Sequence, residues 1–174
     1  LRRGAGHVVA VDVGYGQIAW RLREDPRVTV LERTNVRTLD PAAVAPAPGL
    51  VVGDLSFISL TLVIPSLVRA AAAEADFLLL VKPQFEVGRE RLGAGGVVRD
   101  TRLHAETVMA VSACARSHGL DVLAAIASPL PGPAGNVEYF LHMRAGSGQE
   151  PDGGLESAVR SAIATGPAGK EARK

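Results

Sequence analysis

The chain has 174 residues and a formal net charge of +1, and 47% of the residues are hydrophobic against 21% charged. This length suits one domain with a substantial core. The small net charge excludes a strongly basic nucleic-acid protein but not a local basic patch. No apolar run reaches the roughly 20 residues of a membrane span, so no membrane partner is expected. Cys114 is the single cysteine and the histidines are scattered, which predicts a cytoplasmic protein without a metal site.

Short apolar runs alternate with helix-like segments along most of the chain. Runs rich in β-branched residues, with the length of buried strands, occupy residues 7–12, 27–32, 50–54 and 77–82. Segments with helical spacing of apolar residues occupy 16–25, 59–75 and 101–119. This alternation predicts an α/β fold with a mostly parallel sheet flanked by helices.

The last two predicted strands, residues 121–130 and 137–143, break the alternation. The segment "PGPAGN" between them is too short for a crossover helix, so the last strand is predicted to run antiparallel. Residues 1–144 are therefore expected to form the folded domain. Residues 145–174 are rich in Gly, Ser and charge, and are expected to be a mobile tail in which "LESAVRSAIA" can form one short helix.

Charged residues stand where several predicted strands end. Asp12, Asp54 and Lys82 each close an apolar run, and Glu138 lies at the start of the antiparallel strand. Ligands of open α/β sheets bind beyond the carboxyl ends of the strands, so these residues are expected at one functional edge. A purely structural ion pair is the alternative for any one of them. Charges from four strands at one edge favour a catalytic site over a structural ion pair.

Four blocks of sequence carry a resemblance to a known family: "VVAVDVGYGQIAWRLREDPRVTVLERTNVR", "VVGDLSFISL", "LLLVKPQFEVGRERLGAGGVVRD" and "SPLPGPAGNVEYFL". They resemble the TlyA-type, haemolysin-like ribosomal RNA methyltransferases, which are relatives of the FtsJ-type 2′-O-methyltransferases. The resemblance covers about residues 1–144. It implies a Rossmann-like class I methyltransferase sheet, S-adenosylmethionine as methyl donor, and 2′-O-methylation of cytidine in the ribosomal RNA of a ribosomal subunit. A monomer is expected.

The family's catalytic signature is Lys-Asp-Lys-Glu, and the resemblance assigns its last three members to Asp54, Lys82 and Glu138. The first lysine, and the first strand with its Gly-rich donor loop, have no counterpart, so the chain is expected to be truncated at its N-terminus. A lysine accepts a proton near neutral pH only if its pKa falls far below about 10.4, and neighbouring carboxylates have the opposite effect. Lys82 is therefore expected to be protonated and ion-paired in this chain.

The resemblance also implies donor contacts and RNA contacts. Expected donor contacts are Asp12 at the ribose, Asn35 near the adenine, and Asp54 and Phe57 in the wall of the pocket. For Asn35 a plain turn residue is the alternative. Basic residues expected to face the RNA backbone are Arg33, Arg89, Arg91 and Arg99, with a solvated flexible loop as the alternative for the segment after Lys82.

Other interpretations remain open. "VVAVDVGYGQ" itself imitates a donor loop, and Glu32 would then be the ribose-binding acid. Against this alternative, the proline-rich residues 33–49 leave little room for the next strand. A non-catalytic RNA- or partner-binding remnant is a second alternative. A dehydrogenase-like nucleotide binder is a third, but the chain lacks Gly-x-Gly-x-x-Gly.

Overall fold

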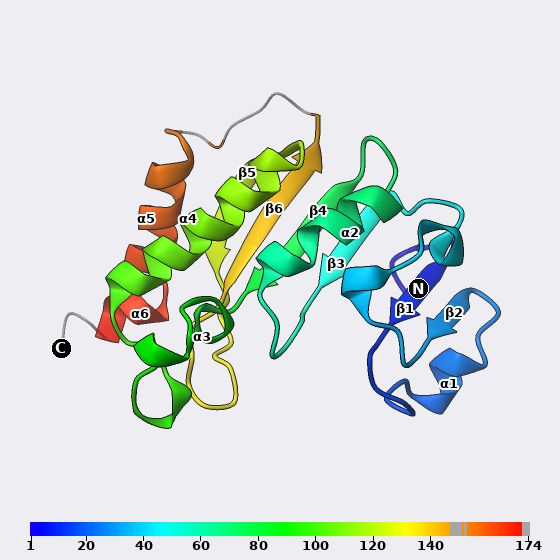
Figure 1. Cartoon of the computed structure of the whole chain (residues 1–174), viewed down its shortest axis with the longest axis horizontal. Coiled ribbons are helices and arrows are strands. Elements are labelled where there is room, and N and C mark those ends of the chain that lie inside the picture. Colours follow the sequence, from blue (N-terminus) through cyan, green and yellow to red (C-terminus); the bar gives the residue numbers. More distant parts are fainter. Residues whose placement is uncertain (147–150, 152, 172–174) are drawn as a thin grey trace.

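The computed structural model describes residues 1–146, 151 and 153–171. Within these residues the strands form two sheets (Figure 1). The smaller sheet pairs β1 (Val8–Val11) with β2 (Val28–Leu31) in parallel. The larger sheet has the order β3-β4-β6-β5, built from strands Leu50–Gly53, Asp76–Val81, Tyr139–Ala145 and Leu120–Ala127 in that order.

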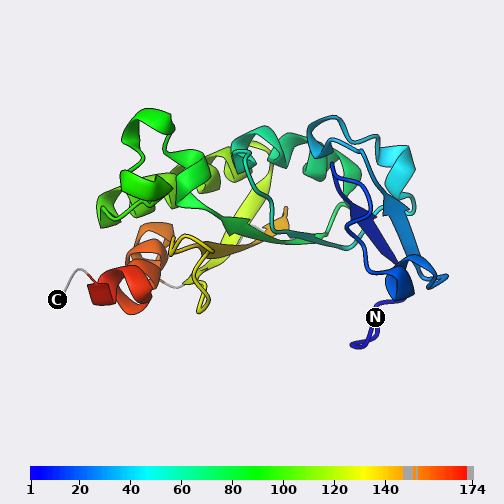
Figure 2. The same cartoon turned by 90° about the horizontal axis from the view of Figure 1, so that it is seen from below.

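Helices cover both faces of the larger sheet (Figure 2). In chain order the α-helices are α1 (Trp20–Arg23), α2 (Ile64–Ala70), α3 (Pro83–Glu86), α4 (Thr101–Ser117), α5 (Leu155–Thr165) and α6 (Pro167–Glu171). Figure 2 shows α2 and α4 on one face of the sheet and α5 on the other. Three-residue or four-residue 3₁₀ turns lie at Val36–Thr38, Pro41–Val44, Leu60–Leu62, Arg89–Arg91 and Ala94–Gly96.

The last strand runs antiparallel, as the short "PGPAGN" connection predicted. β6 pairs antiparallel with β5 and also with β4, so it lies between them. Phe77 lies opposite Met143, and Leu79 lies opposite Leu141. All four side chains are buried in the main core cluster. The sheet is therefore mixed, and its centre is the β4–β6 pair.

Two predicted helices differ from the structure in length. The segment 59–75 begins with a 3₁₀ turn, and α2 starts at Ile64 because Pro65 fits only in the first turn of a helix. The segment 16–25 forms only α1, which buries none of its residues. A helix that buries no apolar face gains little stability from packing, which explains its short length.

The short helix expected after residue 145 forms as α5. Leu155, Val159 and Ile163 recur at helical spacing and belong to the same core cluster as the central strands. This segment therefore differs from the expected mobile tail, because burying an apolar face holds α5 on the sheet. The expected mobile tail also includes residues 147–150, 152 and 172–174, which lie outside the described residues.

Candidate active site

Lys82 and Asp54 meet at the carboxyl ends of β4 and β3. These strands are parallel neighbours, so the residues that follow them emerge at the same edge. Lys82 Nζ lies 2.6 Å from Asp54 Oδ1 and 3.2 Å from Ser56 Oγ. The lysine side chain is 11% exposed and the aspartate side chain 71% exposed. The partly buried cation is thus held by a carboxylate that faces solvent.

Glu138 comes to the same edge from the opposite chain direction. Tyr139, the first residue of β6, pairs with Val81 at the end of the ladder, so Glu138 and Lys82 each lie one residue beyond the same end of the β4–β6 pair. Glu138 is 6% exposed, and its Oε1 accepts a hydrogen bond from Gln84 Nε2 at 3.0 Å. The structure therefore gathers Asp54, Lys82 and Glu138, with Glu138 oriented by Gln84 and Lys82 paired with Asp54.

The loop that carries Asp54 is fastened to the helix that follows Lys82. The carboxylate of Glu86 in α3 accepts hydrogen bonds from Ser59 Oγ at 2.6 Å and from the Leu60 amide at 2.8 Å. Burial raises the pKa of Glu86, against the effect of these two hydrogen bonds. Phe57 adds a second contact, with its ring centroid 5.1 Å from that of Phe85.

Phe57 has two unusual features for an apolar residue. The residue is 91% exposed and its φ angle is 63°. A left-handed backbone at a non-glycine residue is strained, and such strain is concentrated at functional sites. Phe57 therefore stands at the solvent face of the edge that holds Lys82.

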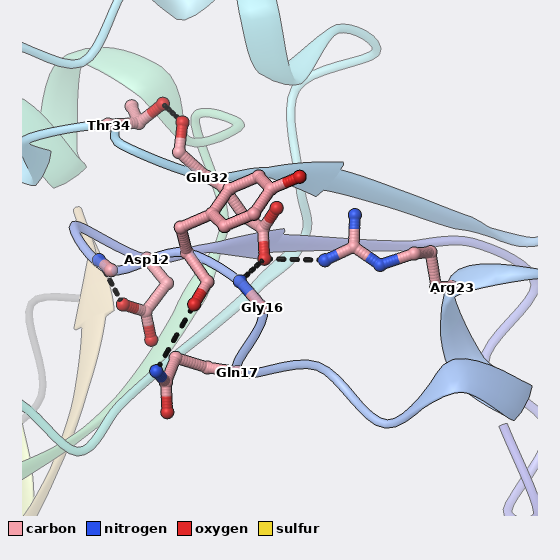
Figure 3. A network of polar contacts seen from close by, with 8 residues as sticks. Asp12, Gly16, Gln17, Arg23, Glu32 and Thr34 are labelled. Atoms are coloured by element: carbon pink, nitrogen blue, oxygen red, sulfur yellow. Dashed lines mark hydrogen bonds and ion pairs between the residues drawn. The ribbon is translucent and has the colours of Figure 1, made fainter.

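Asp12 directly follows β1 and shapes the turn there (Figure 3). Its Oδ1 accepts from the Gly14 amide at 2.6 Å, and its carbonyl oxygen accepts from the Thr34 amide at 3.0 Å. A side chain at residue 14 would crowd the carboxylate, because a Cβ there would lie 3.0 Å from Asp12 Oδ1. The turn holds the Asp12 carboxylate half-buried at the end of the strand.

Glu32, the acid of the alternative donor loop, is engaged within the protein. Its Oε1 accepts from Arg23 Nη2 at 2.5 Å and from the Gly16 amide at 2.6 Å, as Figure 3 shows. The hydrogen bond from Arg23 is the main reason that the pKa of Glu32 is lowered. A ribose hydroxyl would have to compete with a guanidinium for this carboxylate.

Asn35 caps the 3₁₀ turn that follows β2. Its side-chain oxygen accepts from the Arg37 amide at 3.0 Å. This contact is typical of a turn residue, which was the alternative interpretation of Asn35. Next to it, Arg33 has a φ angle of 52°, and its guanidinium carbon lies 4.6 Å from the centroid of the Tyr15 ring.

The three arginines after Lys82 have different surroundings. Arg91 donates to Glu106 Oε1 at 2.5 Å and to the Val87 carbonyl oxygen at 2.7 Å, so its charge is neutralised within the protein. Arg89 and Arg99 are exposed. Arg33 lies elsewhere, in the bend that follows β2 of the smaller sheet.

Three further residues of this edge were not predicted from the sequence: Gln84, Glu86 and Ser56. Gln84 and Glu86 follow Lys82 within one turn, and Pro83 is a helix-start signal that could have indicated them. Ser56, by contrast, has no signal beyond its place in "GDLSF". Within the described residues, no cluster of histidine, cysteine or acidic side chains could hold a metal ion.

An apolar groove of about 490 Å³ lies between the two sheets. It is bordered by β1 and β3, and its floor includes Leu39, Val44 and Leu67. Among the described residues, β1 pairs only with β2, and β3 pairs only with β4. Each of these strands therefore presents an unpaired edge, and both border this groove.

No helix in the described part of the chain is long and apolar enough to span a bilayer.

A family model and a curated relative both match methyltransferases. The family model "FtsJ-like methyltransferase" matches residues 1–145. The 16S/23S rRNA (cytidine-2′-O)-methyltransferase TlyA of Mycobacterium tuberculosis is 56% identical over 168 residues, which are 96% of this chain and 63% of that enzyme.

Solved structures agree with this match. A hemolysin-like protein from Streptococcus thermophilus superposes with a TM-score of 0.89 at 35% identity, covering 99% of this chain and 61% of its own. One from Lactococcus lactis gives 0.83 at 37% identity, covering 92% of this chain and 78% of its own. The chain thus spans less than two thirds of the length of the M. tuberculosis and S. thermophilus proteins.

Proposed function

The chain belongs to the FtsJ-like methyltransferase family, and we propose that it supplies the Asp-Lys-Glu part of an active site that methylates cytidine ribose 2′-hydroxyls in ribosomal RNA with S-adenosylmethionine. One observation carries the proposal: Asp54, Lys82 and Glu138 come to one sheet edge from three strands. The M. tuberculosis enzyme, by its name, acts on cytidine in 16S and 23S rRNA. With ribosomal RNA as the proposed substrate, we place the reaction in the cytoplasm. A monomer stays the expected state.

Lys82 is the candidate base. S-adenosylmethionine, when bound, supplies an electrophilic methyl group. The 2′-hydroxyl must lose its proton as its oxygen is methylated, and a neutral lysine amine at hydrogen-bond distance can accept that proton. In this chain Lys82 Nζ forms an ion pair with Asp54 Oδ1, 2.6 Å away. A further cation beside Lys82 would favour the neutral form, and we assign that role to the signature's first lysine.

We assign donor contacts to Asp12, Asn35, Asp54 and Phe57. Asp12 is supported by its place at the carboxyl end of β1, and Phe57 by its exposure and strained backbone beside Asp54. Asn35 has weaker support, because its side chain already caps a turn. The competing choice of Glu32 is disfavoured by its ion pair with Arg23.

RNA contacts are assigned to Arg33, Arg89, Arg91 and Arg99. Arg89 and Arg99 have the best support, since both are exposed on the loop that follows the strand of Lys82. Arg91 would have to exchange Glu106 for a phosphate. Phosphate contacts of this kind position a nucleic acid without reading its sequence.

We further propose that the first strand and its Gly-rich donor loop come from a segment outside this sequence. The groove between β1 and β3 supports this, because both of its borders are unpaired strand edges and its lining is apolar. A parallel strand laid there would join the two sheets into one. Without that segment, the chain by itself is expected to bind RNA without turnover.

Substitution of Lys82 tests this function. In a longer protein that carries this chain together with such a segment, Lys82→Ala is expected to lower methyl transfer by about 10²–10⁴-fold. Incorporation of a labelled methyl group into ribosomal RNA measures the rate, and calorimetry checks that donor binding is retained. Arg69→Ala, at an exposed position of α2, is the control and is expected to be fully active. Full activity of the Lys82→Ala protein would refute the assignment.

A further inference from the structure

The loop of residues 88–99 carries three of the four arginines proposed to face RNA, and its composition is that of a mobile segment. Gly93, Gly95 and Gly96 lie in it, and the last two have φ angles of 72°. Nevertheless, Val98 near its end is only 4% exposed. Part of this loop is therefore packed into the protein rather than solvated.

Buried side chains satisfy the backbone of this packed part. The Val98 amide donates to Asn136 Oδ1 at 3.0 Å, and the Asn136 side-chain amide donates to the Gly96 carbonyl oxygen at 3.1 Å. His104 Nε2 lies 2.8 Å from the Val98 carbonyl oxygen. Asn136 is 4% exposed and His104 is 1% exposed. Three backbone groups of the loop thus depend on two side chains from other elements.

The chemistry of His104 extends this network to β6. A carbonyl oxygen can only accept, so Nε2 carries the hydrogen toward Val98. In the neutral ring Nδ1 then accepts from the Tyr139 hydroxyl, 2.9 Å away. Burial lowers the pKa of His104, which keeps the ring neutral. Asn136 and Tyr139 stand on either side of Glu138, so the network reaches the candidate active site.

We propose that Asn136 and His104 form a latch that fastens the arginine-bearing loop to the strand of Glu138 and holds it ready for RNA. The inference rests on the proposed function, and it makes these residues positioning residues for substrate binding. A loop that is already ordered loses less conformational entropy when RNA binds. Loosening the latch should therefore weaken RNA binding while leaving the fold of the sheet intact.

Hydrogen exchange tests the latch itself, without any substitution and without RNA. In the unaltered chain the Val98 amide is expected to exchange as slowly as amides of β4, although it lies in a Gly-rich loop. In Asn136→Ala, exchange across residues 94–99 should accelerate at least about tenfold while β4 stays protected. His118→Ala, at the exposed end of α4, is the control and should change nothing. Fast exchange of Val98 in the unaltered chain would overturn the latch.

Measurements of RNA affinity test whether the latch positions the loop for RNA. The dissociation constant for ribosomal RNA, measured by filter binding, is expected to rise about tenfold in Asn136→Ala and to a similar extent when Arg89 and Arg99 are both replaced by Ala. An altered exchange pattern with unchanged RNA affinity would overturn the positioning role. If the unaltered chain fails to bind RNA at all, the proposed function fails, while the exchange measurement still decides whether the latch exists.

Discussion

Glu86 and Ser59 join the two segments that form the candidate active site. The Ser59 hydroxyl donates to Glu86 Oε2 at 2.6 Å, and the neighbouring Leu60 amide donates to Oε1. Ser59 ends the loop that begins at Asp54, and Glu86 ends the helix that begins after Lys82. The Lys82–Asp54 pair is therefore supported at the far end of both segments by a second carboxylate.

This arrangement predicts how stability depends on pH at Glu86. Burial raises the pKa of Glu86 above its ordinary value of 4.5, so the folded state prefers the protonated form. Stability is therefore lost as the pH rises from the unfolded pKa through the folded one. Glu86→Gln stays neutral at every pH. Its free energy of unfolding, measured with denaturant, should therefore rise relative to that of the unaltered chain as the pH increases from 4 to 7. Glu74→Gln, at an exposed position, should show no such gain. An equal difference at both pH values would contradict the prediction.

Asp100 should show the opposite dependence. Its carboxylate caps α4 by accepting from the Arg102 amide, and the Arg102 guanidinium lowers the pKa of Asp100 to about 2. The stabilisation is present above the unfolded pKa and is lost as the pH falls toward 2. Asp100→Ala should lower the Tm at pH 7 by about 2–4 °C, and the difference should shrink as the pH falls toward 2, because the carboxylate becomes protonated. Asp100→Asn keeps an acceptor for the cap and should lose less at pH 7. A Tm difference as large at pH 2 as at pH 7 would argue against a contribution from the carboxylate charge.

Donor binding distinguishes the two possible donor loops. The chain alone is expected to bind S-adenosylmethionine weakly or not at all by calorimetry, because the Gly-rich loop that would approach the donor is assigned to another segment. Micromolar binding, worth roughly 8 kcal/mol, would mean that "VDVGYGQ" is itself the donor loop. Glu32 would then replace Asp12 as the ribose ligand.

The central strand pair should dominate the stability of the larger sheet. Leu141 is fully buried opposite Leu79, so Leu141→Ala should lower the free energy of unfolding by about 2–5 kcal/mol. Leu130 is 75% exposed, and Leu130→Ala should change it by about 0.5 kcal/mol or less. Denaturant titrations followed by circular dichroism compare the two. Equal effects would show that β6 is not the core of the sheet.

The edge that brings Asp54, Lys82 and Glu138 together was predictable because it follows from strand direction alone. Parallel strands end at the same edge, which brought Asp54 to Lys82, and a short connection reversed the last strand, which brought Glu138. Local order in the sequence was enough for both steps.

Other features depend on packing between distant segments. The contact of His104 with Tyr139 joins residues 35 positions apart and requires α4 to lie across β6. The position of β6 beside β4 is equally non-local, since a hairpin predicts only its pairing with β5. The helix α5 was underestimated because the Gly and Ser around it obscure the regular spacing of Leu155, Val159 and Ile163.

The position of β6 between β4 and β5 also determines the order in which the sheet can assemble during synthesis. β5 leaves the ribosome before β6, yet in the described sheet it is hydrogen-bonded only to β6. Until residue 145 has emerged, β4 keeps an unpaired edge and the apolar residues around Leu79 have no cover from Leu141. A nascent chain that stops before β6 is therefore expected to be protease-sensitive and prone to aggregate, and cooperative folding begins only when the last strand inserts.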